Sequence, residues 1–448
     1  MDFFRALRRL WRHRLFRRLL ALRVATQASD AAMQVGLAAY VLFSPNEQPD
    51  AGSIVAVLAI TLLPFSLVGP FISPSLDRWN RRQVFVVTDM VRVVLTTGVA
   101  VLVVFGERSG LAMAAIYVLA LLALSINRFM MAGMSAALAR TVDPDEYLLA
   151  SSTMPIVGPI GGAIGAGTAA AIRLIGGASM PTWQADALIF VAAAIGFAIG
   201  IQLALRIPRT ALGPDPEEAE LVPMRRQAGL VLGDLADAVR HLRERSTAGL
   251  GLLIVLAQRI TYGMVTVSAI LLYRNWFNTV DQVDTALAQL GIWLAATGAG
   301  YIAAAPIAPI IGRRFGVRNM LLAGIVLCAV VQLVPGSIFT QATLVIAAFF
   351  LGLGSQALKV GVDTLIQAQV DDEFKGRSFV LYDMIFNVAL VTGGALVWWL
   401  FPSDGHTLAG FVALAVVFAL IAAVFAVASR RIGVSVFDRG TERAIVGN

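Results

Sequence analysis

The 448-residue chain contains one cysteine, three histidines and few charged residues, which make up 14% of the sequence. The single cysteine, Cys328, cannot form a disulfide within the chain. The histidines are far apart, and there is neither the Cys/His spacing of a metal site nor a phosphate-binding loop ending in Gly-Lys-Ser/Thr. We therefore expect no metal, no cofactor, no catalytic residue and no ATP hydrolysis.

Apolar residues, in contrast, are abundant: they make up 58% of the chain, and the mean hydropathy is +0.79. A soluble domain of this size could not cover so much apolar surface. A helix needs roughly 20 apolar residues to cross a bilayer, and such stretches recur along the chain between short charged or Pro/Gly-bearing breaks. We predict an all-α integral membrane protein with twelve transmembrane helices at residues 19–43, 53–73, 83–105, 111–138, 150–175, 183–205, 248–273, 285–309, 319–335, 342–367, 378–401 and 405–429.

The net charge of +7 comes from basic residues at the ends of the apolar runs rather than from a polar domain, so we expect no nucleic-acid partner. Basic residues in short connections indicate topology instead. Most of them fall on the side of the two termini, whereas the opposite side has only Arg108, Arg173 and Arg274. We predict a multi-pass protein of the bacterial inner (cytoplasmic) membrane with both termini in the cytoplasm.

Polar stretches divide the chain into five parts. Residues 1–18 combine an apolar face with arginines, which favours an interfacial helix on the anionic inner leaflet; the alternative is a basic leader that only orients the first span. Residues 207–246 are the longest polar stretch, and we interpret them as a cytoplasmic linker with an amphipathic helix. The linker separates an N-terminal six-helix bundle at 19–206 from a C-terminal six-helix bundle at 247–430, which a cytoplasmic tail follows at 431–448.

The two halves resemble distant copies of each other. Three short segments recur in the same order in both: Gln27 to Met33 with Gln258 to Met264, residues 77–82 with 313–318, and residues 142–147 with 370–374. This pattern indicates two parallel repeats with pseudo-symmetric bundles.

The segment from Gly69 to Arg82, between the second and third spans, resembles motif A of the major facilitator superfamily: a small-residue helix end leads into Asp-Arg and a basic pair. The resemblance implies that Asp77, Arg78 and Arg82 latch the two bundles together when the outside is open. Ser73 and Asn80 stand where the motif has glycines, so the turn departs from the family pattern. The alternative is that these residues only set topology. To the same cytoplasmic charge network we assign Arg81, Asp89, Arg92 and Asp383.

The fifth span contains Gly158, Pro159, Gly161 and Gly162, which resemble motif C of exporters although the spacing is one residue shorter. Small residues let helices approach closely, and proline bends a span. The resemblance implies export, whereas close helix packing alone would also select these residues. The loops Arg140 to Glu146 and Val370 to Arg377 resemble those of the enterobactin-exporter and macrolide-efflux branch.

Charged residues inside apolar spans are costly, by roughly 2.5–3.5 kcal/mol at the bilayer centre, so they normally face a cavity or a partner. The candidates, with their polar neighbours, are Asp30, Arg128, Arg259, Lys359, Asp363, Gln27, Asn127 and Gln258. They lie on spans one, four, seven and ten, which line the central pathway in the superfamily.

Two interpretations remain open for four of these charges. Asp30 carries a proton during transport or forms a fixed ion pair between helices. Lys359 and Asp363, four residues apart, bind substrate or neutralise each other. Arg259 binds an anionic head group or pairs with Asp30.

The major facilitator resemblance and these charges predict a proton-coupled exporter that works by alternating access as a monomer. Its expected partners are a small amphipathic substrate such as a drug, a siderophore or a lipid-like metabolite, together with protons and membrane lipid. The alternatives are a lysophospholipid or glycolipid flippase and, from another class, a non-transporting receptor or scaffold.

Overall fold

The computed structural model describes residues 10–42, 49–67, 79–105, 110–143, 146–177, 179–213, 224–279, 281–334 and 336–439. Within these ranges all regular secondary structure is helical. Of the four arginines on which the interfacial helix depends, Arg5, Arg8 and Arg9 lie outside the described residues, as do Asp77, Arg78 and Arg108, while Arg12 lies in a turn before α2.

Each of the twelve predicted spans coincides with one described helix. The first six are α2 (Arg14–Leu42), α3 (Ala51–Leu67), α5 (Arg81–Phe105), α6 (Gly110–Leu138), α7 (Tyr147–Gly177) and α8 (Thr182–Leu205). The second six are α10 (Ser246–Leu271), which continues as the π-helix η2 (Leu272–Trp276), and α11 (Val283–Phe315), α12 (Val317–Leu333), α13 (Gln341–Gln369), α14 (Asp372–Leu400) and α15 (Leu408–Ile432). Two further helices are α9 (Met224–Glu244) and α16 (Val434–Asp438).

Of the described helices, nine are long and apolar enough to cross a membrane by themselves. The described parts of α3 and α12 are shorter apolar helices. The last of the twelve span helices, α2, is less apolar because it carries Gln27, Asp30 and Gln34 along one side of its length. The predicted all-helical membrane fold is therefore confirmed, with the polar residues of the first span as its chief irregularity.

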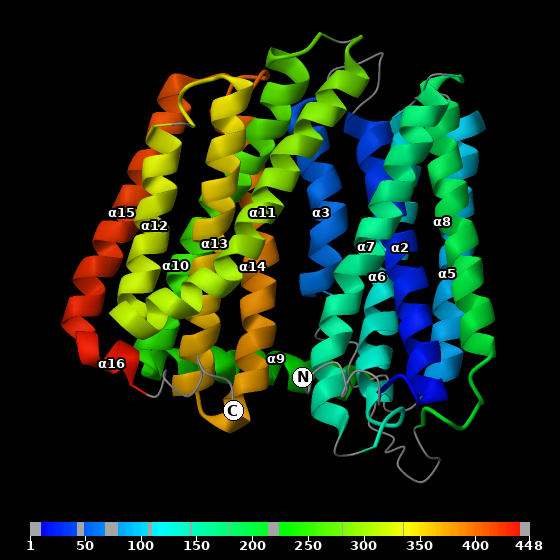
Figure 1. Cartoon of the computed structure of the whole chain (residues 1–448), viewed down its shortest axis with the longest axis horizontal. Helices are drawn as coiled ribbons and strands as arrows, with labels where there is room; N and C mark the ends of the chain where they lie inside the picture. Colours follow the sequence, from blue (N-terminus) through cyan, green and yellow to red (C-terminus); the bar gives the residue numbers. More distant parts are fainter. Residues whose placement is uncertain are drawn as a thin grey trace. The chain divides into compact units, whose positions relative to one another are not determined.

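The chain divides into two compact units, Met1–Ser44 with Ala56–Gly229, and Pro45–Val55 with Leu230–Asn448. In unit 1, α2 packs along α7 and α8, and α5 packs along α8 and α6 (Figure 1). In unit 2, α10 packs along α14 and α15, and α12 packs along α15 and α13. In chain order, unit 2 repeats the helices of unit 1: α2, α5, α6, α7 and α8 correspond to α10, α12, α13, α14 and α15. The four helix pairings of unit 1 therefore recur in unit 2. This is the packing expected of a repeated six-helix bundle.

Glycines let the backbones of the equivalent pairs approach closely. On α7, Gly161 and Gly165 face the backbone of α2, and a Cβ at either position would meet the carbonyl oxygen of Val24 or Ala28. In unit 2 the equivalent contact between α10 and α14 is made by Gly263, which faces the carbonyl of Leu390, and by Gly393, which faces that of Ile260. Membrane helices associate largely through such close packing of small residues.

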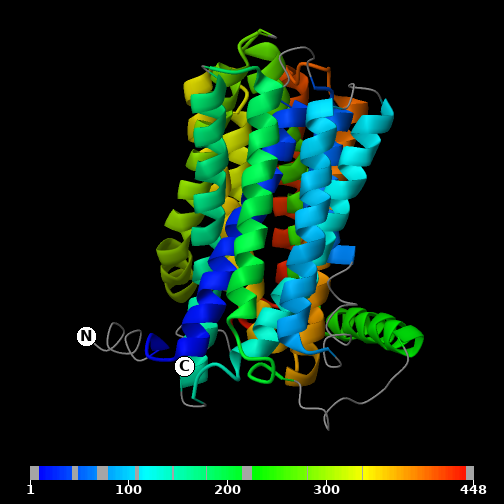
Figure 2. The same cartoon turned by 90° about the vertical axis from the view of Figure 1, so that its right-hand side faces the viewer.

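The part of α9 that belongs to unit 2 runs across the end of α10 and α14 instead of along them (Figure 2). Arg377 of α14 pairs with Asp234 of α9 at 3.2 Å, and the His241 ring stacks on Phe374 at 4.3 Å between centroids. Just before α10, the Arg245 guanidinium donates hydrogen bonds to both carboxylate oxygens of Asp371, at 2.7 and 2.8 Å. An apolar face and several charges thus fix this helix at the end of the bundle.

Candidate functional site

A buried triad of charges lies in unit 1. Arg92 of α5 donates one hydrogen bond to Asp89, one turn earlier on the same helix, at 3.0 Å, and another to Asp30 of α2. Its guanidinium also lies 3.9 Å from the ring centroid of Phe197 on α8. Asp30 is 3% exposed, and Asp89 and Arg92 are fully buried. Three helices therefore surround these charges and exclude water from them.

The triad contains two carboxylates and only one guanidinium. The second oxygen of Asp30 and that of Asp89 have no hydrogen-bond partner among the described residues. An excess negative charge in a buried site costs several kcal/mol. The triad is electrically neutral only when one of its two carboxylates is protonated, so it can take up and release a proton.

Asp89 and Arg92 belong to the triad with Asp30 of α2. We assigned both to the charge network of the turn after the second span, whose residues 68–78 lie outside the described ones, so that assignment stays a prediction. The sequence gives their place on α5 but not the reach of the arginine side chain, which here extends to a different helix. Asp30 consequently has a cationic partner inside its own unit.

Arg82 contacts the end of α8, and Arg81 contacts the segment that follows it. Arg82 donates to the carbonyl of Leu205 at 3.1 Å, and Arg81 donates to the carbonyl of Leu212 at 2.8 Å. A cation is favourable at Leu205 because the last carbonyls of a helix lack partners and carry partial negative charge. These contacts hold α5 to α8, while a latching role for the pair stays a prediction. Asp383 is exposed on α14, and its assignment to the network also stays a prediction.

A second polar group in unit 1 surrounds Gly158 of α7. A Cβ at Gly158 would lie 3.2 Å from the Arg23 guanidinium and 3.7 Å from the Gln27 amide nitrogen, so the glycine leaves room for two side chains of α2. Arg23 also donates to the sulfur of Met131 on α6 at 3.5 Å. No described carboxylate lies within 4.0 Å of the Arg23 guanidinium. The group is therefore positively charged.

The other motif C residues and the predicted α6 residues are placed as follows. Gly161 packs on α2, whereas Pro159 is exposed and Gly162 has open space where its side chain would be. Asn127 is 2% exposed, and Arg128 is partly exposed on the same helix. Helix packing thus accounts for Gly161, but the structure shows no contact that explains Gly162.

In unit 2, Arg259 of α10 is held among aromatic side chains. Its guanidinium lies 3.5 Å from the ring centroid of Phe386 on α14 and 4.9 Å from that of Tyr262, and it donates to the hydroxyl of Tyr301 on α11 at 3.4 Å. The side chain is 3% exposed, and no described carboxylate lies within 4.0 Å of it. Arg259 is a buried cation whose charge no described carboxylate neutralises.

Lys359 and Asp363 of α13 form an ion pair at 2.7 Å, with side chains 34% and 27% exposed within the structure. The Lys359 ammonium also lies 5.3 Å from the ring centroid of Tyr382 on α14. One turn earlier on α13, Ser355 accepts a hydrogen bond from Gln258 of α10 at 3.0 Å. This ion pair lies within one helix, as it would if Lys359 and Asp363 only neutralised each other. Both side chains nevertheless remain partly accessible.

Sequence reasoning missed Arg23, Tyr301 and Phe386. Arg23 lies one helical turn before Gln27, so the same-face spacing of a helix could have drawn attention to it. Tyr301 and Phe386 carry no such signal, because aromatic residues are common in membrane helices and only the packing of α11 and α14 against α10 brings these two to Arg259.

Comparison with known proteins agrees with this architecture. The family model described as Major Facilitator Superfamily matches residues 269–443. A protein of Mycobacterium tuberculosis strain H37Rv, named as an uncharacterized MFS-type transporter, is 31% identical over 399 residues, covering 87% of this chain and 86% of that protein. An equally named protein of Mycobacterium bovis gives the same values.

Two solved structures have similar folds at low sequence identity. The nucleoside transporter NupG has a TM-score of 0.63 at 13% identity, covering 93% of this chain and 99% of that one. A bacterial homolog of the human lysosomal transporter Spinster has a TM-score of 0.60 at 13% identity, covering 92% and 96%. The chain belongs to the major facilitator superfamily of membrane transporters.

Proposed function

We propose that this protein is a proton-coupled secondary transporter that exports an amphipathic compound with an anionic head group. The observation that carries the proposal is the buried triad of Asp30, Asp89 and Arg92, in which two carboxylates share one guanidinium. Such a site changes its charge when it binds a proton, and proton-driven transport needs a group of this kind in the membrane.

The cations outside the triad support an anionic head group. Among the described residues, neither the buried Arg259 nor Arg23 of unit 1 has a carboxylate within 4.0 Å. A buried cation without a counter-charge costs several kcal/mol. A substrate carboxylate, phosphate or sulfonate supplies that charge, while the aromatic rings of Phe386 and Tyr262 offer apolar surface beside it. Charge-assisted hydrogen bonds from arginine are well suited to such groups.

Direction and location rest on sequence features. Export is favoured by the motif C resemblance at Gly158 to Gly162 and by the loops that resemble the enterobactin-exporter and macrolide-efflux branch. The concentration of arginine on one side of the predicted spans favours the bacterial inner membrane with both termini in the cytoplasm. We propose that the protein works there as a monomer.

Reconstitution into liposomes tests this function. The vesicles contain a pH-sensitive dye and receive a panel of anionic amphiphiles that includes a fluorescent lysophosphatidylglycerol. We expect one class of probe to move in response to an imposed pH gradient, with matching proton flux, and we expect Asp30→Asn to lose both. Glu373→Gln is the matched control, because Glu373 is an exposed acid at the start of α14.

The other outcomes decide between the alternatives. If the lipid probe equilibrates without a gradient and Asp30→Asn leaves its rate unchanged, the protein is a flippase and proton coupling is wrong. If no probe moves and no proton flux appears while the protein stays folded, a receptor or scaffold explains the chain better.

A further inference from the structure

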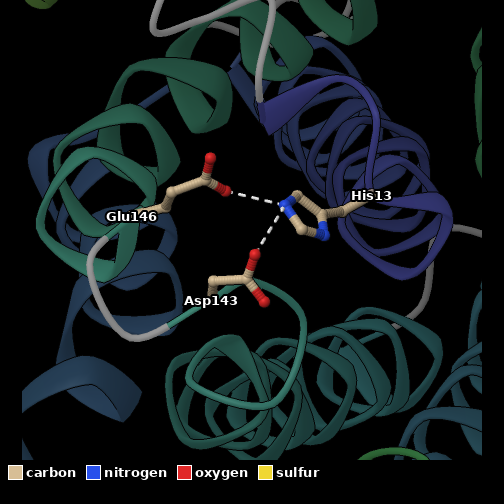
Figure 3. A group of neighbouring side chains, drawn as sticks. All are labelled: His13, Asp143 and Glu146. Carbon is tan, nitrogen blue, oxygen red and sulfur yellow. Dashed lines mark hydrogen bonds and ion pairs between the residues drawn. The ribbon is translucent and has the colours of Figure 1, made fainter.

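Three side chains from two distant parts of the chain converge at one end of unit 1 (Figure 3). His13 immediately precedes α2, while Asp143 and Glu146 belong to the turn between α6 and α7. The Nε2 atom of His13 lies 2.7 Å from a carboxylate oxygen of Glu146 and 3.9 Å from one of Asp143. All three ligand atoms lie within 4.8 Å of one another.

We propose that His13, Asp143 and Glu146 bind a divalent transition-metal ion, for which Zn²⁺ is the best fit. In tetrahedral Zn²⁺ sites the bonds to nitrogen and oxygen are about 2.0–2.2 Å long, which places the ligand atoms roughly 3.4 Å apart. The separations from His13, 2.7 and 3.9 Å, lie on either side of that value, and the two carboxylate oxygens lie within 4.8 Å of each other, so side-chain movements on the order of an ångström complete the geometry. A neutral imidazole and two carboxylates also balance the charge of a divalent cation.

The donor set distinguishes between metals. Ca²⁺ and Mg²⁺ prefer shells made only of oxygen, with at least about six ligands. An imidazole nitrogen beside two carboxylates suits Zn²⁺, Co²⁺ or Ni²⁺ better. Three protein ligands leave a fourth position, and the 69% exposure of the Asp143 side chain leaves that position open to water.

The backbone around the ligands is fixed from both directions. The His13 amide donates to the carbonyl of Leu10 at 3.1 Å, and the Glu146 amide donates to that of Asp143 at 3.0 Å. Leu10 is fully buried in the apolar cluster that also contains Ala150 at the start of α7. The backbone hydrogen bond between Glu146 and Asp143 thus keeps the two acids close together beside the histidine. Ligands supported in this way need little rearrangement to bind an ion.

A bound ion would join the start of α2 to the turn between α6 and α7. Because the unfolded chain does not bring these residues together, binding would stabilise unit 1 by mass action. The competing explanation is that His13 and Glu146 form only a hydrogen bond or an ion pair, and under that explanation added metal has no effect on stability.

Metal binding by the full-length protein, purified in detergent without a histidine tag, separates the two explanations. We expect isothermal titration to show one Zn²⁺ per chain, a rise in Tm with added Zn²⁺, and a visible d–d absorption band with Co²⁺. Excess Mg²⁺ or Ca²⁺ should not compete. Glu146→Gln and His13→Gln should each weaken binding by about tenfold or more and abolish the rise in Tm.

Matched variants check that the effect belongs to this cluster. His406→Gln removes a histidine that stacks on Trp276 in unit 2, and Glu373→Gln removes an exposed acid, so both should keep full Zn²⁺ affinity. The proposal is overturned if the wild-type protein shows no Co²⁺ band, or if Glu146→Gln binds Zn²⁺ as tightly as the wild type. The Co²⁺ measurement needs no variant, so a variant that fails to fold cannot hide a negative result.

Discussion

At the scale of single residues, the charges inside the helices fall into two groups. Arg92 pairs with the carboxylates of Asp30 and Asp89, so its positive charge stabilises the folded state of unit 1. Arg259 contacts aromatic rings and a hydroxyl, and no described carboxylate lies within 4.0 Å of it. The same substitution should therefore have different consequences at these two arginines.

We predict that Arg92→Leu strongly destabilises the protein, because it leaves two buried carboxylates without a cation. Breaking a buried ion pair by removing one partner costs about 3–5 kcal/mol. Unfolding in SDS titrations measures the loss. The double variant Asp30→Asn with Asp89→Asn, combined with Arg92→Leu, should recover most of it, and no recovery would contradict the triad.

Arg259→Leu should change stability by less than about 2 kcal/mol, since it removes a costly buried cation together with cation–π contacts worth about 1–2 kcal/mol. Substrate binding should fall sharply for anionic amphiphiles and hardly at all for neutral ones of similar size. Competition binding with paired probes measures the difference. Equal losses for both kinds of probe would argue against a role for the charge.

At the scale of helices, close backbone contact between equivalent helix pairs holds each unit together. On α7, Gly165 packs against the backbone of Ala28, whereas Gly167, two residues later, has no atom near the position of a Cβ. The two glycines lie on one helix and differ only in what they face, so they form a matched pair.

We predict that Gly165→Ala destabilises the protein by about 1–3 kcal/mol, because the added Cβ forces α7 away from α2. Gly167→Ala should be neutral or slightly stabilising, since alanine favours a helix over glycine by up to about 1 kcal/mol. Thermal unfolding in detergent measures both variants. If both variants changed stability equally, helix propensity rather than packing against α2 would determine the stability at these two positions.

The junction of α9, α10 and α14 depends on a charge pair outside the membrane spans. The hydrogen bond from Arg245 lowers the pKa of the Asp371 carboxyl, and the same contact raises the pKa of Arg245. A carboxyl whose pKa is lowered by folding stabilises the folded state above its unfolded value, near 3.9. That contribution is lost as pH falls through the lower, folded pKa.

Amide exchange in α9 from Leu230 onward should therefore accelerate below about pH 4, as Asp371 takes up its proton. In Asp371→Asn the exchange should already be faster at neutral pH, and this acid step should be missing. Hydrogen–deuterium exchange with mass spectrometry measures the segment directly. If exchange in the variant still accelerated at acid pH as in the wild type, a carboxyl other than Asp371 would be responsible for the acceleration.

At the scale of the whole molecule, four helix pairings that recur in the two units support a duplicated bundle. The twelve predicted spans are an even number and therefore predict that both termini lie on one side of the membrane. The single cysteine makes this testable, because Cys328 is fully buried on α12 and the wild-type protein should not react with a membrane-impermeant maleimide.

We predict that Ser403→Cys, in the exposed connection between α14 and α15, reacts with this reagent in intact cells. Glu244→Cys, at the end of α9, should react only after the cells are permeabilised. Both labels are measured on the full-length chain in a Cys328→Ala background. The reverse pattern would overturn the predicted orientation, although not the fold.

The sequence alone determined the twelve helices and their order, because the hydrocarbon core imposes a length and an apolar composition that can be counted along the chain. It also identified Asp30, Arg259, Lys359 and Asp363 as unusual, since a charge in an apolar run is costly wherever its partner lies. The pair Lys359 and Asp363 was visible as well, because residues four apart share a helix face.

Only the tertiary structure decided which charges meet. Packing against α8 brings the helix of Asp30 and the helix of Arg92 close enough for these two side chains to pair. In the same way, His13 contacts a carboxylate 133 residues away. Spacing along a chain predicts contacts within one helix, but contacts between helices depend on which glycines let backbones approach and how far each side chain reaches. The partner of each buried charge, and with it the chemistry of the site, is therefore a property of the folded bundle.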